Sequence, residues 1–244
     1  MLKAVDLSKR FDNAWALQGL SLEIGAGEIQ CLLGANGAGK TTTINLFLGF
    51  LEPTSGAAYV NGREVARNAQ AARADLAYVP EQVNLYPTLT GLENLIYFTR
   101  LAGRRAVDRG LLMHLLARVG LDRRAADIRI ERYSKGMRQK VGLAIALAKG
   151  ARALLLDEPL SGLDPKAANE FCALLRRLAN EGAAVLMATH DLFRAREVAT
   201  HIGIMKNGRL IARVAAPEVS HVQLEALYLD YMREPGEASH GAAA

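Results

Sequence analysis

The chain has 244 residues, of which 50% are hydrophobic, 6% aromatic and 23% charged, and these proportions suit one large globular domain. Lysine and arginine number 30 against 25 acids. Because the arginines are scattered and no aromatic residues alternate with them, we interpret them as a solvated basic surface and expect no nucleic-acid partner. The same surface also suits an anionic membrane. Two cysteines, Cys31 and Cys172, give neither a disulfide framework nor the spacing of a metal site.

The sequence predicts no targeting signal and no membrane span. The first residues lack the apolar stretch of a signal peptide. The longest apolar segment, residues 141–156, is interrupted by Lys149 and Arg152 and is too short to cross a bilayer. We therefore expect a cytoplasmic chain that needs another polypeptide for any role in a membrane.

The first part of the chain predicts short strands and one buried strand followed by a helix. Residues 1–27 alternate weakly between apolar and polar positions and contain three glycines, which is typical of antiparallel strands. Residues 57–62 predict another hairpin, because they end in Asn-Gly, which suits a type I′ turn. Between these regions, residues 28–33 form an apolar run typical of a buried strand, and residues 42–48 are apolar at helical spacing.

The middle of the chain is predominantly helical and then alternates between strand and helix. Helical patterns cover residues 92–101, 107–119 and 134–149. Two short apolar runs, at 153–157 and 184–188, flank a helical pattern, and this alternation predicts parallel strands in an open α/β sheet. The flanked helix spans residues 166–181.

The C-terminal part predicts a hairpin and one more helix. Residues 202–214 are expected to turn at Asn207-Gly208. In the helix that follows, over residues 221–231, four apolar residues fall on one face: Leu224, Leu227, Tyr228 and Tyr231.

A phosphate-binding loop lies between the buried strand and its helix, with the pattern G-x-x-x-x-G-K-[ST]. Its glycines let backbone amides close around phosphate oxygens, and the helix dipole favours their charge. Lys40 is expected to reach the β- and γ-phosphates, and the Thr41 hydroxyl to bind Mg²⁺. The alternative, a glycine-rich turn with a chance Lys-Thr pair, fits the flanking strand and helix less well. The residues expected to bind nucleotide here are Gly34, Ala35, Asn36, Gly37, Ala38, Gly39, Lys40, Thr41 and Thr42.

Two carboxylates end the strand at residues 153–157. Asp157 suits coordination of Mg²⁺, directly or through water, and Glu158 is placed to accept a proton from an attacking water. Strand ends often carry acids, so the pair is a weak signal alone. It becomes a strong signal after a phosphate-binding loop and before His190.

With these motifs in place, residues 1–215 resemble the nucleotide-binding subunits of ABC transporters. The resemblance assigns Asp157 to the acid that binds Mg²⁺ and Glu158 to the catalytic base. It assigns Gln82 to the glutamine that contacts Mg²⁺ and the attacking water, and His190 to the family's switch histidine. Residues 161–164 match the family's D-loop.

The signature motif departs from the family's usual form. Residues 133–139 read Tyr-Ser-Lys-Gly-Met-Arg-Gln where the family usually begins Leu-Ser-Gly-Gly-Gln, and this variant looks like the ABC-2 class of exporters. Ser134 and Gly136 remain, so a helix N-terminus with a serine cap still faces an anion. Phe11 stands in the place of the aromatic residue that stacks on adenine. Trp15 is a rival for that role, and a core position is the alternative for Phe11.

The resemblance implies an α/β fold: a P-loop NTPase core with a mixed or parallel sheet, an antiparallel β subdomain and an α-helical signature subdomain. We expect an ABC ATPase domain over residues 1–215, with its helical subdomain at about 85–150. A short docking helix over 216–233 and a disordered tail over 234–244 would follow.

The resemblance also implies that the chain binds and hydrolyses ATP, with Mg²⁺, to drive a separately encoded permease, above all an ABC-2 exporter. Ser134 and Gly136 of a second copy would cap the ATP held by Lys40 and Thr41, and the permease would dock near residues 83–89. The chain would then lie at the inner face of the cell membrane through the permease. A soluble ABC ATPase acting on ribosomes or DNA and the ATPase of an ABC importer are the alternatives.

Overall fold

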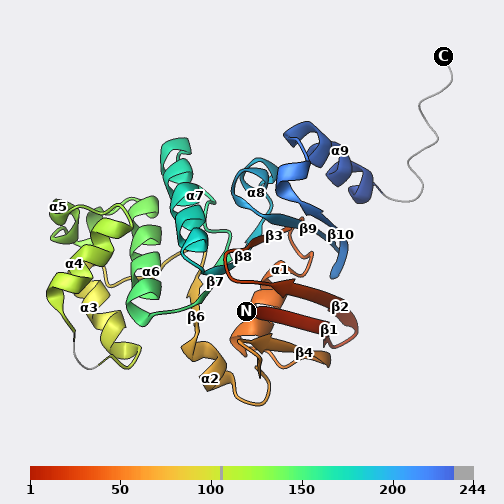
Figure 1. The fold of residues 1–244 in the computed structure, drawn as a ribbon, viewed down its shortest axis with the longest axis horizontal. Helices are drawn as coiled ribbons and strands as arrows, with labels where there is room; N and C mark the ends of the chain where they lie inside the picture. Colours follow the sequence, from red (N-terminus) through yellow and green to blue (C-terminus); the bar gives the residue numbers. More distant parts are fainter. Residues whose placement is uncertain (105–106, 234–244) are drawn as a thin grey trace.

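The computed structural model describes residues 1–104 and 107–233, and their strands form two sheets (Figure 1). The larger sheet has the strand order β10, β9, β3, β8, β7, β6, and only the pairing of β10 with β9 is antiparallel. The mixed sheet expected from the sequence is therefore confirmed. In that spatial order its strands are Arg209–Ala215, His201–Lys206, Ile29–Leu33, Ala184–Thr189, Ala153–Asp157 and Leu76–Val79.

The smaller sheet is antiparallel and has the order β2, β1, β4, β5. It confirms the antiparallel strands expected near the N-terminus. Asn61 and Gly62, which join β4 to β5, have φ of 49° and 77°, as the expected type I′ turn requires. Its strands are Leu2–Phe11, Ala14–Ile24, Ser55–Val60 and Arg63–Glu64.

The core lies on both faces of the larger sheet, because its central strands β3, β7 and β8 are buried along their whole length. In β7, Leu154 and Leu156 face one side and Leu155 faces the other, as the alternation of a strand dictates. On the side of Leu155, helix α1 (Lys40–Leu48) packs against strands of both sheets. On the opposite side lie α6 (Lys135–Lys149), α7 (Pro165–Asn180) and α8 (Leu192–Val198).

One group of helices, called the lateral region below, lies on the left of Figure 1 and packs on the larger sheet through the contact of α6 with β6. Thr90 starts α3 with a capping box, in which its side chain accepts from Glu93 N–H and Glu93 accepts from Thr90 N–H. The region comprises α3 (Gly91–Leu101), α4 (Arg109–Arg118), α5 (Arg123–Ala126), η1 (Ile130–Arg132) and α6.

The C-terminal helix α9 (His221–Met232) packs on α8. Leu224 is buried and Leu227 and Tyr228 are half-buried, as the helical pattern predicts, whereas Tyr231 is exposed. Lys206 donates to the carbonyl groups of three residues at the end of the helix, where a cation is favoured by the dipole. The tail expected over 234–244 lies outside the described residues.

The elements that were not predicted include strand β6, the short helices α2 (Ala69–Ala74), α5 and α8, and the single turns η1 and η2 (Ala216–Glu218). Each is too short for periodicity to reveal it. In the part of the chain that the structure describes, no helix is long and apolar enough to span a bilayer.

Candidate active site

The phosphate-binding loop joins β3 to α1 and is shaped by glycine. Gly39, the N-cap of α1, has φ of 100°, and a Cβ built on it would lie 2.5 Å from the carbonyl oxygen of Ala16, so no other residue fits there without strain. No side chain caps the described start of α1, and its first turn holds no acid. The first backbone N–H groups of α1 are therefore left for an anion.

Lys40 lies folded against the loop. Its Nζ donates to the carbonyl oxygens of Gly34 at 2.6 Å and Ala35 at 3.1 Å, and the side chain is 6% exposed. Burial lowers the pKa of Lys40, and the nearby carboxylates of Glu158 and Asp157 oppose that shift. If Lys40 turned toward an anion, it would exchange two neutral carbonyl partners for a charged one, and hydrogen bonds between charged groups are stronger.

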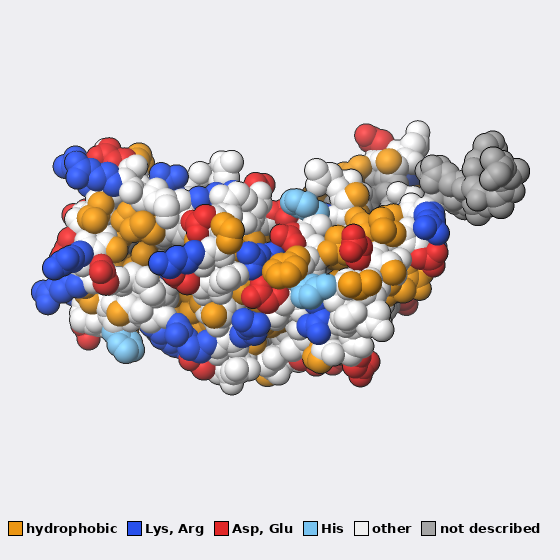
Figure 2. Space-filling view, turned by 90° about the horizontal axis from the view of Figure 1, so that it is seen from above, with side chains coloured by type: hydrophobic (Ala, Val, Ile, Leu, Met, Phe, Trp, Pro, Cys, Tyr) orange, Lys and Arg blue, Asp and Glu red, His pale blue; other side chains and the backbone are white. Residues whose placement is uncertain are grey.

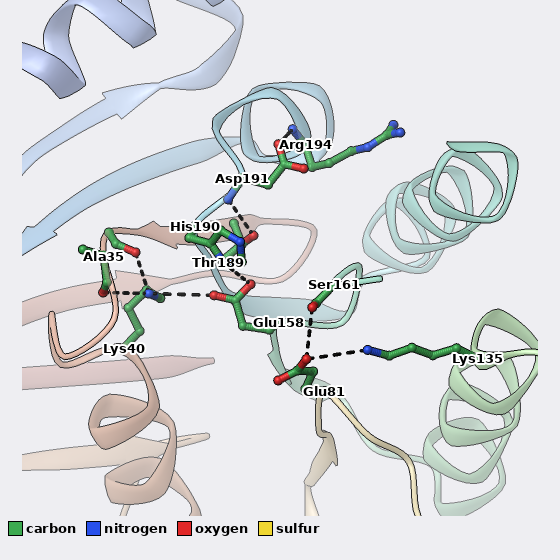
Figure 3. Close-up of polar contacts among 11 residues, drawn as sticks. Ala35, Lys40, Glu81, Lys135, Glu158, Ser161, Thr189, His190, Asp191 and Arg194 are labelled. Atoms are coloured by element: carbon green, nitrogen blue, oxygen red, sulfur yellow. Dashed lines mark hydrogen bonds and ion pairs between the residues drawn. The ribbon is translucent and has the colours of Figure 1, made fainter. Parts of the chain in front are cut away.

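Glu158 lies between Lys40 and His190 in Figure 3 and contacts both. Its Oε1 lies 3.8 Å from Nζ of Lys40, and its Oε2 lies 3.0 Å from Nδ1 of His190. Glu158 has φ of 46°, an uncommon conformation for a residue with a Cβ, and strain of this kind gathers at functional sites. The backbone N–H of Glu158 donates to the carbonyl of Ala188 at 2.9 Å, which fixes the residue beside the end of β8.

The carboxyl groups of the site are poorly hydrated. Burial raises the pKa of Asp157, while a hydrogen bond from Thr41 and the charge of Lys40 act in the opposite direction. Oε1 of Glu158 is buried and has no hydrogen-bond partner among the described residues. A buried acceptor without a partner indicates that a further group, such as water or a ligand, completes this site.

A cavity of about 700 Å³ joins these groups. It brings Asp157, Glu158 and Gln82 together with residues 36–42 of the loop, although these segments lie far apart in the sequence. Its other lining residues are Ala16, Tyr78, Pro80 and Glu81.

The structure places six expected site residues away from the lining of the cavity as the described residues form it. Two of them, Gly34 and Ala35, take part through their carbonyl groups, which accept from Lys40. His190 reaches the site through Glu158 and is 60% exposed. Ser134 caps α6, with its hydroxyl accepting from Met137 N–H at 3.2 Å, and Gly136 is buried in the first turn of that helix. Phe11 is 44% exposed at the end of β1 and contacts the ammonium of Lys9, and its rival Trp15 is equally exposed beside Arg10.

Sequence reasoning missed Glu81 and Tyr78. Glu81 accepts a hydrogen bond from Ser161 and pairs with Lys135, and burial raises the pKa of Tyr78. Strand β6 is the feature that could have revealed them. Residues at and after the carboxyl end of a parallel strand lie at the same edge of the sheet as Asp157 and His190. Because β6 was not recognised, Glu81 and Tyr78 were not considered, and Gln82 was identified only through the resemblance to the family.

The fold and this site define a P-loop ATPase. Residues 17–161 match the model of the ABC transporter family. The chain is 36% identical over 210 residues to a Nod factor export ATP-binding protein I of Paraburkholderia xenovorans, covering 86% of this chain and 69% of that protein. It is 32% identical to the linearmycin resistance ATP-binding protein LnrL of Bacillus subtilis, covering 87% of this chain and 68% of that protein.

Solved structures of ABC transporter subunits have the same fold as this chain. The ATP-binding subunit of an ABC transporter superposes with a TM-score of 0.80 at 30% identity, over 96% of this chain and all of that one. The dimeric cassette MJ0796 gives 0.79 at 29% identity, over 88% and 99%. The chain therefore belongs to the ABC transporter family, as an ATP-binding and ATP-hydrolysing subunit, and the predicted family, fold and activity are confirmed.

Proposed function

We propose that this chain powers a separately encoded permease of the exporter type. The named relatives support this direction, since one serves Nod factor export and another linearmycin resistance. The signature variant at 133–139 points the same way through its resemblance to ABC-2 exporters. The substrate of the permease does not enter this argument, because the residues of an ATPase subunit act on the nucleotide.

The nucleotide site suggests a role for each group. Lys40 turns from the loop carbonyls to the β- and γ-phosphates, and the amides at the start of α1 hold the remaining oxygens. Glu158 accepts the proton of the attacking water, and its uncommon backbone conformation aims the carboxylate into the cavity. His190 holds Oε2 of Glu158, so that Oε1 remains for the water.

Mg²⁺ fits beside these groups. The Thr41 hydroxyl and the carboxylate of Asp157 are oxygen ligands of the kind that Mg²⁺ prefers, and the desolvated Asp157 gains from a nearby cation. Bound there with ATP, the ion would neutralise charge on the phosphates. Gln82 lines the same cavity and is the further residue that we assign to the ion and the water.

A second copy of the chain would complete the site. Ser134, the N-cap of α6, is exposed and lies outside the cavity of its own subunit, so it is available to a nucleotide bound elsewhere. Gly136 is buried in the first turn of the helix behind it. The dimeric cassette MJ0796 offers a precedent among related structures. In a symmetric pair, each α6 would cap the triphosphate held by the loop of the other subunit.

One observation carries the permease proposal: an exposed apolar surface formed by Tyr86, Tyr97 and Leu101. Their exposed fractions are 45%, 41% and 70%, and the hydroxyls of the two tyrosines are joined at 3.1 Å. The segment that carries Tyr86 begins directly after Gln82, so a partner bound there would sense the nucleotide. Leu85 and Leu89 are partly buried, and Leu85 packs on the core, so the tyrosines suit a test better.

The charge around this surface supports a place near a membrane. Residues 85–150 hold thirteen basic and five acidic side chains, whereas the whole chain has 30 and 25. Figure 2 shows blue lysines and arginines spread over the left part of the molecule, where α3 to α6 lie. We therefore propose that the chain works at the inner face of the cell membrane, where anionic lipids favour such a surface.

The test is to purify the tagged full chain from membranes in mild detergent and identify its partners. A multi-span membrane protein that is retained by the native chain and lost with Tyr97→Glu would support the proposal. Phe50→Glu, which changes a more exposed aromatic residue outside this surface, is the control. Ribosomal or DNA-bound partners with no membrane protein would favour a soluble ABC ATPase, and a permease that comes with an extracellular solute-binding protein would favour an importer.

A further inference from the structure

The carboxylate of Glu81 joins three segments around the cavity. Its Oε1 accepts a hydrogen bond from Oγ of Ser161 at 3.0 Å and lies 3.6 Å from Nζ of Lys135 (Figure 3). Ser161 belongs to the loop that follows Glu158, and Lys135 is the first residue of α6. One carboxylate at the edge of the nucleotide cavity therefore holds the lysine of the signature motif.

A separate contact fixes the backbone of Glu81 to the same helix. Gln139, which is fully buried, lies one turn after Lys135. Its Nε2 donates to the carbonyl oxygens of Pro80 at 3.1 Å and Glu81 at 2.8 Å. Because this contact holds α6 to the segment after β6, Lys135 can change its partner without a loss of the local fold.

The ion pair between Lys135 and Glu81 is suited to exchange. The two side chains are 31% and 50% exposed, and pairs with such access to water contribute little to stability. In the described structure Glu81 is the only carboxylate paired with Lys135, and no acid lies in the first turn of α6. The positive end of the helix adds to the lysine, so an anion with more charge than one carboxylate would compete effectively.

We propose that Lys135 is a switched residue, held by Glu81 in the separate subunit and transferred to the triphosphate of the partner's site when two subunits close. This inference rests on the proposed composite site. Its new content is the exchange: closure on one nucleotide frees Glu81 and Ser161 at the edge of the other cavity, beside Gln82. The two sites of a dimer would thereby be coupled through one carboxylate on each side.

The test measures ATP-dependent dimerisation of the full chain by analytical ultracentrifugation, in a Glu158→Gln background that retains ATP. Lys135→Gln should raise the ATP concentration for half-dimerisation by about 10- to 100-fold, the range of a lost charge-assisted contact. Glu81→Gln should lower it by about two- to fivefold, because an exposed ion pair no longer retains the lysine. Glu170→Gln, which removes the 2.7 Å partner of Lys140 on the same helix, is the control and should have no effect.

The double variant decides the matter. If Glu81 acts by holding Lys135, then adding Glu81→Gln to Lys135→Gln changes nothing further. ATP binding to the separate subunit should also be unchanged by Lys135→Gln, since that residue does not line the cavity. The switch would be overturned if Glu81→Gln left the ATP concentration for half-dimerisation unchanged, or if the effects of the two substitutions on it were additive in the double variant. Either result would leave the composite site standing. If the Glu158→Gln variant alone does not dimerise at any ATP concentration, the composite site itself is refuted, and the switch with it.

Discussion

Replacement of Glu158 by glutamine tests the assignment of the catalytic base most directly. The amide has the same shape, so it can keep the contact with His190, but it cannot accept a proton. We expect turnover to fall by about 10²- to 10⁴-fold, which corresponds to about 3–5 kcal/mol in the activation free energy. Lys40 keeps its bonds to Gly34 and Ala35, so the free energy of unfolding should change by only about 1 kcal/mol.

The assay compares phosphate release at saturating ATP with equilibrium binding of ATP to the same preparation. ATP binding should be retained in Glu158→Gln while phosphate release is lost. Glu181→Gln is a matched control, because it changes a carboxylate that pairs with Arg118 away from the cavity. Turnover close to the native value would refute the role of Glu158 as the base, and loss of ATP binding would assign the residue to binding instead.

Three further predictions concern the binding of nucleotide and the carboxylates of the site. Lys40→Ala should weaken ATP binding by about 10- to 100-fold, because a charge-assisted contact to the phosphates is lost, and calorimetry that finds native affinity would contradict this. Asp157→Asn should raise the thermal midpoint of the nucleotide-free protein at pH 7. Burial raises the folded-state pKa of Asp157, so the folded protein favours the protonated side chain. The stability that this proton contributes is fully present below the ordinary aspartate pKa of about 3.9, and it is lost as the pH rises through the folded-state value. At pH 7 the buried charge therefore costs stability, and the neutral asparagine avoids that cost. The advantage of the variant should therefore disappear as the pH is lowered toward 4, and an advantage that persists there would have another cause. If Phe11 stacks on adenine, Phe11→Ala should weaken the binding of ATP by about five- to 100-fold and leave the affinity for tripolyphosphate unchanged. If Trp15 has that role instead, Trp15→Ala should show this pattern and Phe11→Ala should not.

The sequence predicted those parts of the site that local patterns encode. The loop ending in Lys40 and Thr41 needs glycines in a fixed order, and the strand before Asp157 is apolar throughout, so both stand out without knowledge of the fold. The Asn-Gly turns were predictable for the same reason, since Asn61 and Asn207 both adopt positive φ.

Other features depend on tertiary structure. Strand β6 has only four residues, and it is recognisable as a strand because β7 pairs with it. Glu81 became a candidate only when this strand was known. The position of Phe11 also depends on how the smaller sheet sits against the loop, and the cavity as described is lined by Ala16 rather than by either aromatic residue.

The topology explains why distant motifs meet. Strands β3, β6, β7 and β8 are parallel neighbours in one sheet, so the residues that follow them converge at one edge. Lys40, Gln82, Glu158 and His190 all come after the carboxyl ends of these strands. Ser134 follows no strand of this sheet and begins a helix of the lateral region, so the same rule does not bring it to its own cavity. A nucleotide contact by Ser134 therefore requires another copy of the chain or a movement of α6, and the bonds from Gln139 to the segment after β6 oppose such a movement.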